Sequence, residues 1–228
     1  MTTVILFDID GTLVLTGGAG VRAMTRAFDD LFSVPNAFAA IPMPGRTDAS
    51  IFADAAAAHS IPPTNLPRFR DAYLGHLVVE LQKPGPRKGI PTGVRELLDA
   101  LDRRDDVYLA LLSGNFETAA RAKLEYFDLW RYFRCGAFGD AAPDRASLLP
   151  KALAEVHASG GPAATPSETV VIGDTPLDVA CAAAGGARSL AVATGGYDVE
   201  ALRAAGADTV FADLSDTAAV LRALTLVV

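Results

Sequence analysis

The chain has 228 residues, half of them apolar, which is enough for one hydrophobic core together with a small accessory unit. Its net charge of −7 provides no positive field to attract nucleic acid or an anionic membrane surface. The sequence has no signal peptide pattern, no apolar stretch long enough to span a membrane and no CxxC cysteine pair, so we expect a cytoplasmic protein. We expect it to be a monomer or a small homo-oligomer.

The first predicted element is a buried strand at 4–7, a β-branched and aromatic run that leads into Asp8-Ile9-Asp10-Gly11-Thr12. Apolar residues at positions 21, 24, 28 and 31 then recur at helical spacing. Further helices are expected at about 48–59 and 66–81.

Prolines and glycines between positions 84 and 91 interrupt all regular structure and predict a linker. We therefore predict a helical cap domain at 16–88, inserted into a core domain that consists of 1–15 and 89–228. The basic residues beside the linker are interpreted as solvated surface charges. They are Lys83, Arg87 and Lys88.

After the linker, helical and strand patterns alternate to the end of the chain. Helices are expected at 94–101, 116–127 and 146–158, and strands at 107–112, 137–138, 169–172, 188–193 and 209–212. This rhythm predicts an α/β fold, a Rossmann-like parallel sheet with helices on both faces. Ligands of such sheets bind beyond the carboxyl ends of the strands, so chemistry is expected there.

Three segments bring polar residues to those strand ends. Asp8 and Asp10 follow the first strand, Ser113-Gly114-Asn115 follows the strand at 107–112, and Asp174 with Asp178 follows the strand at 169–172. Carboxylates gathered so closely repel one another, and a hard divalent cation with oxygen ligands relieves the repulsion. Mg²⁺ is the expected cofactor.

An aspartate can attack phosphorus and split one displacement into two easier ones. Asp8 is placed for this role, while Asp10, two residues on, is a candidate to give a proton to the leaving alcohol and later to take one from water. The Ser113 hydroxyl and the backbone N–H groups of Gly114 and Asn115 are candidate donors to the phosphoryl oxygens.

These motifs, with Gly173-Asp174-Thr175-Pro176-Leu177-Asp178, resemble those of the haloacid dehalogenase superfamily. Their order and the helical segment after the first motif resemble the branch of phosphoglycolate-phosphatase-like and β-phosphoglucomutase-like proteins with a helical cap. The resemblance implies an Asp8 nucleophile, an Asp10 acid and base, and Mg²⁺ held by Asp8, the Asp10 carbonyl and Asp174, with Asp178 assisting. Superfamily members that hydrolyse carbon–halogen bonds are expected to lack an acid at the Asp10 position, so the name of the superfamily does not give the activity expected of this chain.

One motif departs from the family pattern, which places a lysine before the helix that leads to the Gly-Asp strand. Arg145 and Lys151 are the candidates for this cationic role. Arg145 precedes the buried positions Leu148 and Leu149 by three and four residues, whereas Lys151 lies off the apolar stripe. We therefore assign the role to Arg145, whose guanidinium binds by a fork and differs from an ammonium.

Two positions have an alternative structural explanation. Thr175 to Asp178 is also a helix capping box with proline at the first helical position, and this role can coexist with metal binding. Arg46, in Gly45-Arg46-Thr47-Asp48, either reads the non-reacting end of a substrate or belongs to a surface loop in which Asp48 caps a helix.

The function predicted from these features is Mg²⁺-dependent hydrolysis of a small organic phosphate monoester through an aspartyl phosphate on Asp8. One alternative is a phosphosugar mutase. A phosphonate hydrolase is disfavoured because 16–82 contains no lysine for a Schiff base. A regulatory phosphoacceptor domain is disfavoured by the helical segment and by Asp10. Phosphoglycolate, a sugar phosphate and a nucleoside monophosphate all stay open as the substrate.

Overall fold

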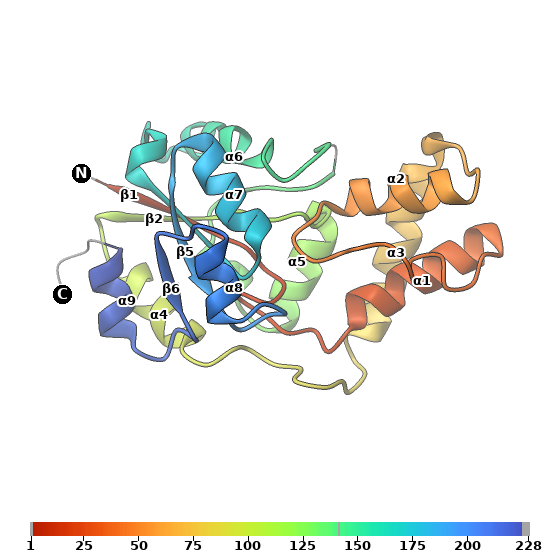
Figure 1. Ribbon diagram of the computed structural model, residues 1–228, viewed down its shortest axis with the longest axis horizontal. Coiled ribbons are helices and arrows are strands. Elements are labelled where there is room, and N and C mark those ends of the chain that lie inside the picture. Colours follow the sequence, from red (N-terminus) through yellow and green to blue (C-terminus); the bar gives the residue numbers. More distant parts are fainter. Residues whose placement is uncertain (1, 141, 225–228) are drawn as a thin grey trace.

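The computed structural model describes residues 2–140 and 142–224. Its centre is a six-stranded sheet in the order β3-β2-β1-β4-β5-β6, in which every pairing is parallel. Helices flank the sheet, which confirms the predicted Rossmann-like α/β fold (Figure 1). The strands are β1 Thr3–Phe7, β2 Val107–Leu112, β3 Gly136–Ala137, β4 Thr169–Gly173, β5 Arg188–Val192 and β6 Thr209–Phe211.

The helices are α1 Ala19–Phe32, α2 Asp48–Ala58, α3 Leu66–Glu80, α4 Val94–Asp102, α5 Glu117–Tyr126, α6 Leu148–Ala158, α7 Pro176–Gly185, α8 Val199–Ala204 and α9 Thr217–Ala223. The five helices with predicted ranges, α2 to α6, also agree with the structure, and their predicted ends lie within two residues of those observed. None of the helices is both long and apolar enough to cross a membrane, within the part of the chain that the structure describes.

Successive residues of β1 point to opposite faces of the sheet, and both faces are buried. Ile5 and Phe7 join a cluster with apolar side chains of α4, α5 and α9, whereas Val4 and Leu6 join a cluster with side chains of α6 and α7. Each fully buried side chain of this size contributes about 1.5–3 kcal/mol relative to exposure. The strand is therefore apolar throughout, as a central strand covered on both faces must be.

Helices α1, α2 and α3 form a separate helical segment with its own hydrophobic cluster. Phe28, Phe52 and Phe69 are at its centre, with ring centroids 6.1 Å apart for Phe28 and Phe69 and 4.8 Å apart for Phe52 and Phe69. In Figure 1 this segment lies at one end of the molecule, with α5 between it and the sheet. Phe116 and Ala119, at the start of α5, belong to the same cluster and join the helical segment to the rest of the chain.

Glu80 connects α1 and α3 electrostatically. Its buried carboxylate pairs with Arg22 at 2.7 Å, with Arg26 at 3.1 Å and with Lys83 at 2.5 Å. Hydrogen bonds from Lys83 and Arg22 lower the pKa of Glu80 to about 2, so the carboxylate is ionised at neutral pH. The end of α3 is thereby tied to the start of α1.

Two segments connect the helical segment to the sheet, and they lie side by side. Leu15 and Gly89 form an antiparallel bridge, with N–H to carbonyl distances of 2.8 and 2.9 Å. The Lys88 ammonium donates to the Leu81 carbonyl and to the Tyr126 hydroxyl at 2.8 Å, and the Arg87 guanidinium donates to the Thr194 carbonyl at 2.6 Å. Arg87 is exposed as expected and Lys88 is partly buried, but neither is only a solvated surface charge, because their head groups bind neighbouring segments at this connection.

Candidate active site

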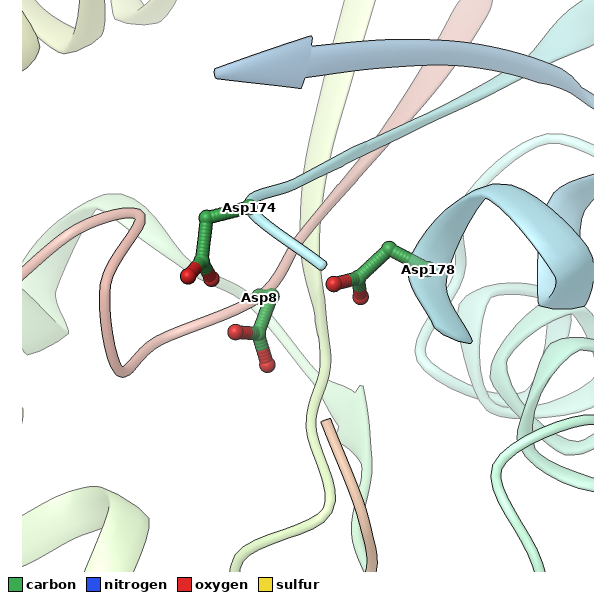
Figure 2. A group of neighbouring side chains, drawn as sticks. All are labelled: Asp8, Asp174 and Asp178. Atoms are coloured by element: carbon green, nitrogen blue, oxygen red, sulfur yellow. The ribbon is translucent and has the colours of Figure 1, made fainter. Parts of the chain in front are cut away.

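Three aspartates meet beyond the carboxyl ends of two neighbouring strands. Asp8 directly follows β1, Asp174 directly follows β4, and Asp178 lies in the first turn of α7. All three are buried, and each offers a carboxylate oxygen within 4.8 Å of the other two (Figure 2). The sequence prediction that these residues share one acidic pocket agrees with this geometry.

Glycines make room for these carboxylates. A Cβ atom on Gly11 or Gly195 would overlap the Asp174 carboxylate, and a Cβ atom on Gly173 would overlap Asp178. Gly11 also has φ = +88°, which glycine adopts readily, so it both turns the chain after β1 and admits Asp174. The Thr12 hydroxyl donates to Asp174 Oδ1 at 3.2 Å and fixes its orientation.

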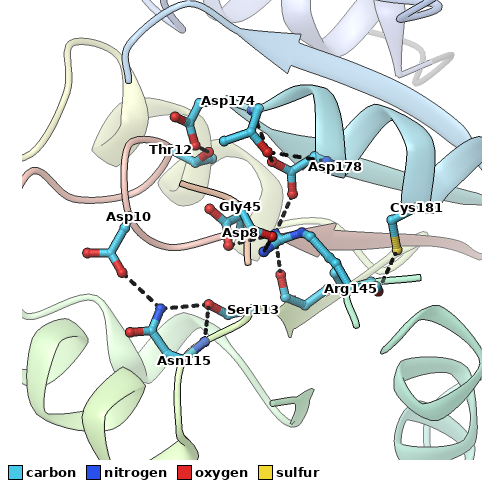
Figure 3. A network of polar contacts seen from close by, with 12 residues as sticks. Asp8, Asp10, Thr12, Gly45, Ser113, Asn115, Arg145, Asp174, Asp178 and Cys181 are labelled. Carbon is cyan, nitrogen blue, oxygen red and sulfur yellow. Dashed lines mark hydrogen bonds and ion pairs between the residues drawn. The ribbon is translucent and has the colours of Figure 1, made fainter. Parts of the chain in front are cut away.

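The Arg145 guanidinium lies between two of the aspartates. One of its nitrogens is 2.7 Å from Asp8 Oδ1 and also pairs with Asp178 Oδ1, as Figure 3 shows from close by. Two backbone carbonyls, those of Gly45 and Leu112, accept from the same side chain at 3.3 Å. Lys151, the other candidate for the cationic role, is exposed and does not line the cavity of this site.

The pKa values follow from burial and repulsion. Burial raises the pKa of Asp8 to about 6 against the attraction of Arg145, and burial together with Asp8 and Asp178 raises the pKa of Asp174 well above its usual value. Arg145 thus supplies one positive charge to three carboxylates, which leaves uncompensated repulsion. Oxygen donors with this excess of negative charge fit a hard divalent cation such as Mg²⁺.

Asp178 has a structural role as well. Its Oδ2 accepts from the backbone N–H of Thr175 at 3.0 Å and from the Thr175 hydroxyl at 2.7 Å, and Thr175 Oγ1 accepts from the Asp178 N–H. The predicted capping box at the start of α7 is therefore present, with Pro176 at the first helical position. Asp178 thus stabilises the N-terminus of α7 through Oδ2 and holds the Arg145 guanidinium in place through Oδ1.

Asp10 belongs to a second polar cluster in the same cavity. Its Oδ2 accepts from Asn115 Nδ2 at 2.8 Å (Figure 3) and lies 2.5 Å from Lys123 Nζ. Lys123 Nζ also donates to Asn115 Oδ1 at 2.5 Å, so the three side chains form a closed set of contacts.

Lys123 was missed by the sequence analysis. Its side chain is only 4% exposed, on the face of α5 that also buries Ala119, Ala120 and Leu124. A lysine on the apolar stripe of a helix, eight residues after the polar motif that ends at Asn115, is the signal that could have identified it.

Ser113 and Gly114 differ in their position relative to the cavity. Ser113 Oγ is fully buried, accepts from Asn115 Nδ2 at 2.9 Å and does not line the cavity. Gly114 lines the cavity, and a Cβ atom there would overlap the Arg46 carbonyl. The Asp48 N–H donates to the Gly114 carbonyl at 2.7 Å, so the helical segment lies directly against this loop.

Asp48 is buried and does not cap its own helix as in the surface-loop alternative. Thr47 caps α2, because its hydroxyl oxygen accepts from the Ser50 N–H at 3.2 Å. The Asp48 carboxylate instead reaches the start of α5 and accepts from the Phe116 N–H at 2.9 Å. Burial raises the pKa of Asp48 to about 7, against the effects of Lys123 and the Phe116 N–H.

The two clusters open into one cavity of about 550 Å³ between the sheet and the helical segment. This volume is typical of small-molecule sites, which occupy about 300–1,000 Å³. Arg46 lines the cavity, as predicted for a substrate-reading residue, but its guanidinium pairs with Asp54 at 2.8 Å. It also donates to the carbonyls of Pro42 at 3.2 Å and Ser50 at 3.4 Å.

The family model for haloacid dehalogenase-like hydrolases matches residues 5–183, a range that contains all of the aspartates described above. The chain belongs to the haloacid dehalogenase-like hydrolases. No curated protein sequence matches it.

Solved structures of this family share the fold over nearly the whole chain. CbbY from Rhodobacter sphaeroides, solved with phosphate, is 19% identical with a TM-score of 0.70 and coverage of 95% of this chain and 96% of that one. A predicted phosphoglycolate phosphatase from Haemophilus somnus 129pt is 19% identical, with a TM-score of 0.67 and coverages of 96% and 97%. A putative beta-phosphoglucomutase from Thermotoga maritima is 20% identical, with a TM-score of 0.64 and coverages of 98% and 100%. The resemblance to the haloacid dehalogenase superfamily is confirmed by the family model, and the phosphoglycolate-phosphatase-like and beta-phosphoglucomutase-like structures share the fold of this chain.

Proposed function

We propose that this haloacid dehalogenase-like protein is a Mg²⁺-dependent phosphatase that hydrolyses a small organic phosphate monoester through an aspartyl phosphate on Asp8. The observation that carries the proposal is the environment of Asp8. Its Oδ1 pairs with Arg145, while its Oδ2 has no ion pair or hydrogen bond within the described residues, and the residue lines the cavity. One carboxylate oxygen is thus held and the other is available to attack phosphorus.

The reaction takes place in two displacements. In the first, an Asp8 oxygen forms a bond to phosphorus, the ester P–O bond breaks, and Asp10 gives a proton to the departing alcohol. In the second, Asp10 takes a proton from water as the water oxygen bonds to phosphorus, and the bond between phosphorus and Asp8 breaks. Arg145 neutralises charge on Asp8 and the phosphoryl group, and the cavity-lining backbone at Gly114 and Asn115 offers N–H donors to the phosphoryl oxygens.

Asp8, Asp174 and the Asp10 carbonyl are the proposed ligands of Mg²⁺, with Asp178 assisting through its contact with Arg145. When bound, the cation supplies charge neutralisation for the aspartates and the transferred phosphoryl group. Thr12, Gly11 and Gly195 keep Asp174 in place for this role.

The helical segment is proposed to act as a cap domain, residues 16–88, over a core domain formed by 1–15 and 89–228. Its separate hydrophobic cluster and the paired linkers at Leu15 and Gly89 support this division. A cap over the cavity excludes bulk water from the aspartyl phosphate and selects the alcohol part of the substrate.

The test is phosphate release from p-nitrophenyl phosphate with Mg²⁺ present, for the wild-type protein and for Asp8→Asn. We expect continuous release by the wild type, loss with EDTA, recovery with added Mg²⁺, and a decrease of at least 10³-fold in the variant, since its amide is not a nucleophile. Circular dichroism confirms that the variant is folded, and Asp29→Asn, on the exposed face of α1, is the matched control.

An active Asp8→Asn protein would contradict the assignment of Asp8 as the nucleophile. A single turnover per chain would instead indicate a regulatory phosphoacceptor domain. Dependence of turnover on a sugar bisphosphate activator would indicate a phosphosugar mutase.

A further inference from the structure

The wall that the helical segment contributes to the cavity is mostly apolar, with Thr16, Arg46, Asp48 and Tyr73 as its polar side chains. Met24 and Ile51 come from the buried sides of α1 and α2, and Ile41 and Met43 come from the loop that connects these helices. Val21, which is 49% exposed in spite of its apolar side chain, faces the same cavity. Val21 therefore adds exposed apolar surface to this wall, which a hydrocarbon group of a ligand can cover.

The cations around the cavity all have partners. Arg145 is committed to Asp8 and Asp178, and Lys123 to Asp10 and Asn115. The remaining one, Arg46, is neutralised by Asp54 and also donates to two carbonyls. Within the described residues, the part of the lining that comes from the helical segment therefore has no unpaired positive charge for a second anionic group.

Tyr73, like Thr16, is a polar side chain of this wall whose hydroxyl has no hydrogen bond in the described part of the chain. Burial raises its pKa well above 10, so the hydroxyl is a neutral donor at working pH. It suits an uncharged oxygen of a ligand, such as a hydroxyl, an ether or a carbonyl.

From these observations we infer that the substrate is a phosphate monoester of an uncharged, predominantly apolar alcohol or phenol, and that the α1–α2 side of the cavity binds its hydrocarbon part. The inference rests on the proposed phosphatase function and names the substrate class. A buried distal carboxylate or second phosphate would lose its hydration without gaining a cationic partner, whereas each buried methylene strengthens binding about fourfold. Phosphoglycolate and sugar bisphosphates are disfavoured on this ground.

The first experiment compares kcat/KM within matched pairs of esters. Along ethyl, butyl and hexyl phosphate, kcat/KM is expected to rise by about fifteenfold for each added pair of methylenes that is buried. Phenyl phosphate is expected to exceed 4-carboxyphenyl phosphate at least tenfold, since the two differ only in a distal carboxylate. A flat or falling alkyl series, or a preference for the carboxylated ester, overturns the inference and leaves the phosphatase proposal in place.

The second experiment removes the negative charge that neutralises Arg46. Asp54→Asn removes the ion-pair partner, while the carbonyls of Pro42 and Ser50 still hold the guanidinium at the cavity wall. The ratio of kcat/KM for 4-carboxyphenyl phosphate to that for phenyl phosphate is expected to rise at least fivefold. Asp29→Asn makes the same substitution on α1 away from the cavity and should leave the ratio unchanged. An unchanged ratio in Asp54→Asn contradicts the argument from paired charge.

The third experiment does not depend on turnover. Calorimetry on the wild-type protein with Mg²⁺ measures the Kd of ethyl-, butyl- and hexylphosphonate, which resist hydrolysis. A Kd that falls with chain length supports the apolar site, and a Kd that rises or stays constant overturns it. If no ester in the panel is hydrolysed while hexylphosphonate binds more tightly, the phosphatase proposal fails and the apolar site stands.

Discussion

Arg145 and Lys123 are two buried cations that serve two different aspartates of one cavity. Arg145 contacts Asp8, the proposed nucleophile, and Lys123 contacts Asp10, the proposed acid and base. Because Lys123 also holds Asn115, it fixes the Asp10 carboxylate from two directions. We therefore regard Lys123 as a positioning residue.

Lys123→Met is expected to lower kcat about 10²-fold, the lower end of what a positioned acid or base contributes, while KM changes by less than threefold. Methionine keeps the length of the side chain and removes the charge that orients Asp10. Steady-state phosphate release gives both constants, and a thermal melt reports stability separately.

Lys151→Met is the matched control, since Lys151 is exposed on α6 and does not line the cavity. Its kcat should equal that of the wild type. A lower melting temperature of Lys123→Met with an unchanged kcat would show that Lys123 only stabilises the fold.

Site residues at strand ends and site residues buried between helices differ in how well the sequence predicts them. Asp8 and Asp174 follow apolar strands that pair in the sheet, so strand prediction alone brought them together. Lys123 and Asp48 are buried by contacts between α5 and the helical segment, and those contacts depend on how distant elements pack. Local patterns predict a buried strand end, but they do not predict which charged residues another helix covers.

At the scale of elements, α5 connects the helical segment to the sheet. Its N-terminus receives two carboxylates from outside the helix: Asp48 accepts from the Phe116 N–H at 2.9 Å and Asp140 from the Glu117 N–H at 2.8 Å. Oxygen acceptors at a helix N-terminus are stabilising because they pair with N–H groups that have no partner within the helix. Asp48, at the start of α2, thus ties the helical segment to α5.

This contact predicts a pH-dependent difference between the wild type and Asp48→Asn. The folded chain keeps the Asp48 proton up to about pH 7, whereas the unfolded chain loses it near 3.8, so ionisation of this group destabilises the folded state as pH rises between these values. Asparagine still accepts from the Phe116 N–H and does not titrate. The melting temperature of Asp48→Asn relative to wild type should rise by about 3 °C or more from pH 5 to pH 8.

Lys123, Asp10, Asp140 and the Phe116 N–H are the groups that act on Asp48, and the first and last of them favour its ionised form. Melting curves of both proteins at pH 5, 6, 7 and 8 measure the effect. A difference that stays constant or falls with pH would contradict the buried, protonated state of Asp48.

At the scale of the whole molecule, the cavity lies between the helical segment and the carboxyl ends of the strands, and its sheet side is acidic. Uncompensated repulsion among Asp8, Asp174 and Asp178 destabilises the folded state, and a cation bound there stabilises it by mass action. Millimolar Mg²⁺ at pH 8 should raise the melting temperature by about 5 °C, since saturation at 100 times Kd contributes about 2.7 kcal/mol.

Asp174→Asn should lose most of this increase, because it removes one of the proposed ligands. Asp102→Asn, an exposed position on α4, should keep it. Differential scanning fluorimetry with EDTA and with Mg²⁺ provides the measurement, and an equal shift in both variants would place the cation elsewhere.

The hydrogen-bonded pair formed by Leu15 and Gly89 has a consequence for how this protein can change. Because the chain departs from the sheet and returns to it at adjacent points, a stretch of any length can be accommodated between them without displacing a strand. Exchange of that one continuous stretch for the corresponding piece of a relative would alter which molecules are accepted and leave the reactive carboxylates as they are. Diversification of specificity in this architecture therefore requires matching changes mainly at the start of α5, where Phe116 and Ala119 pack against that stretch.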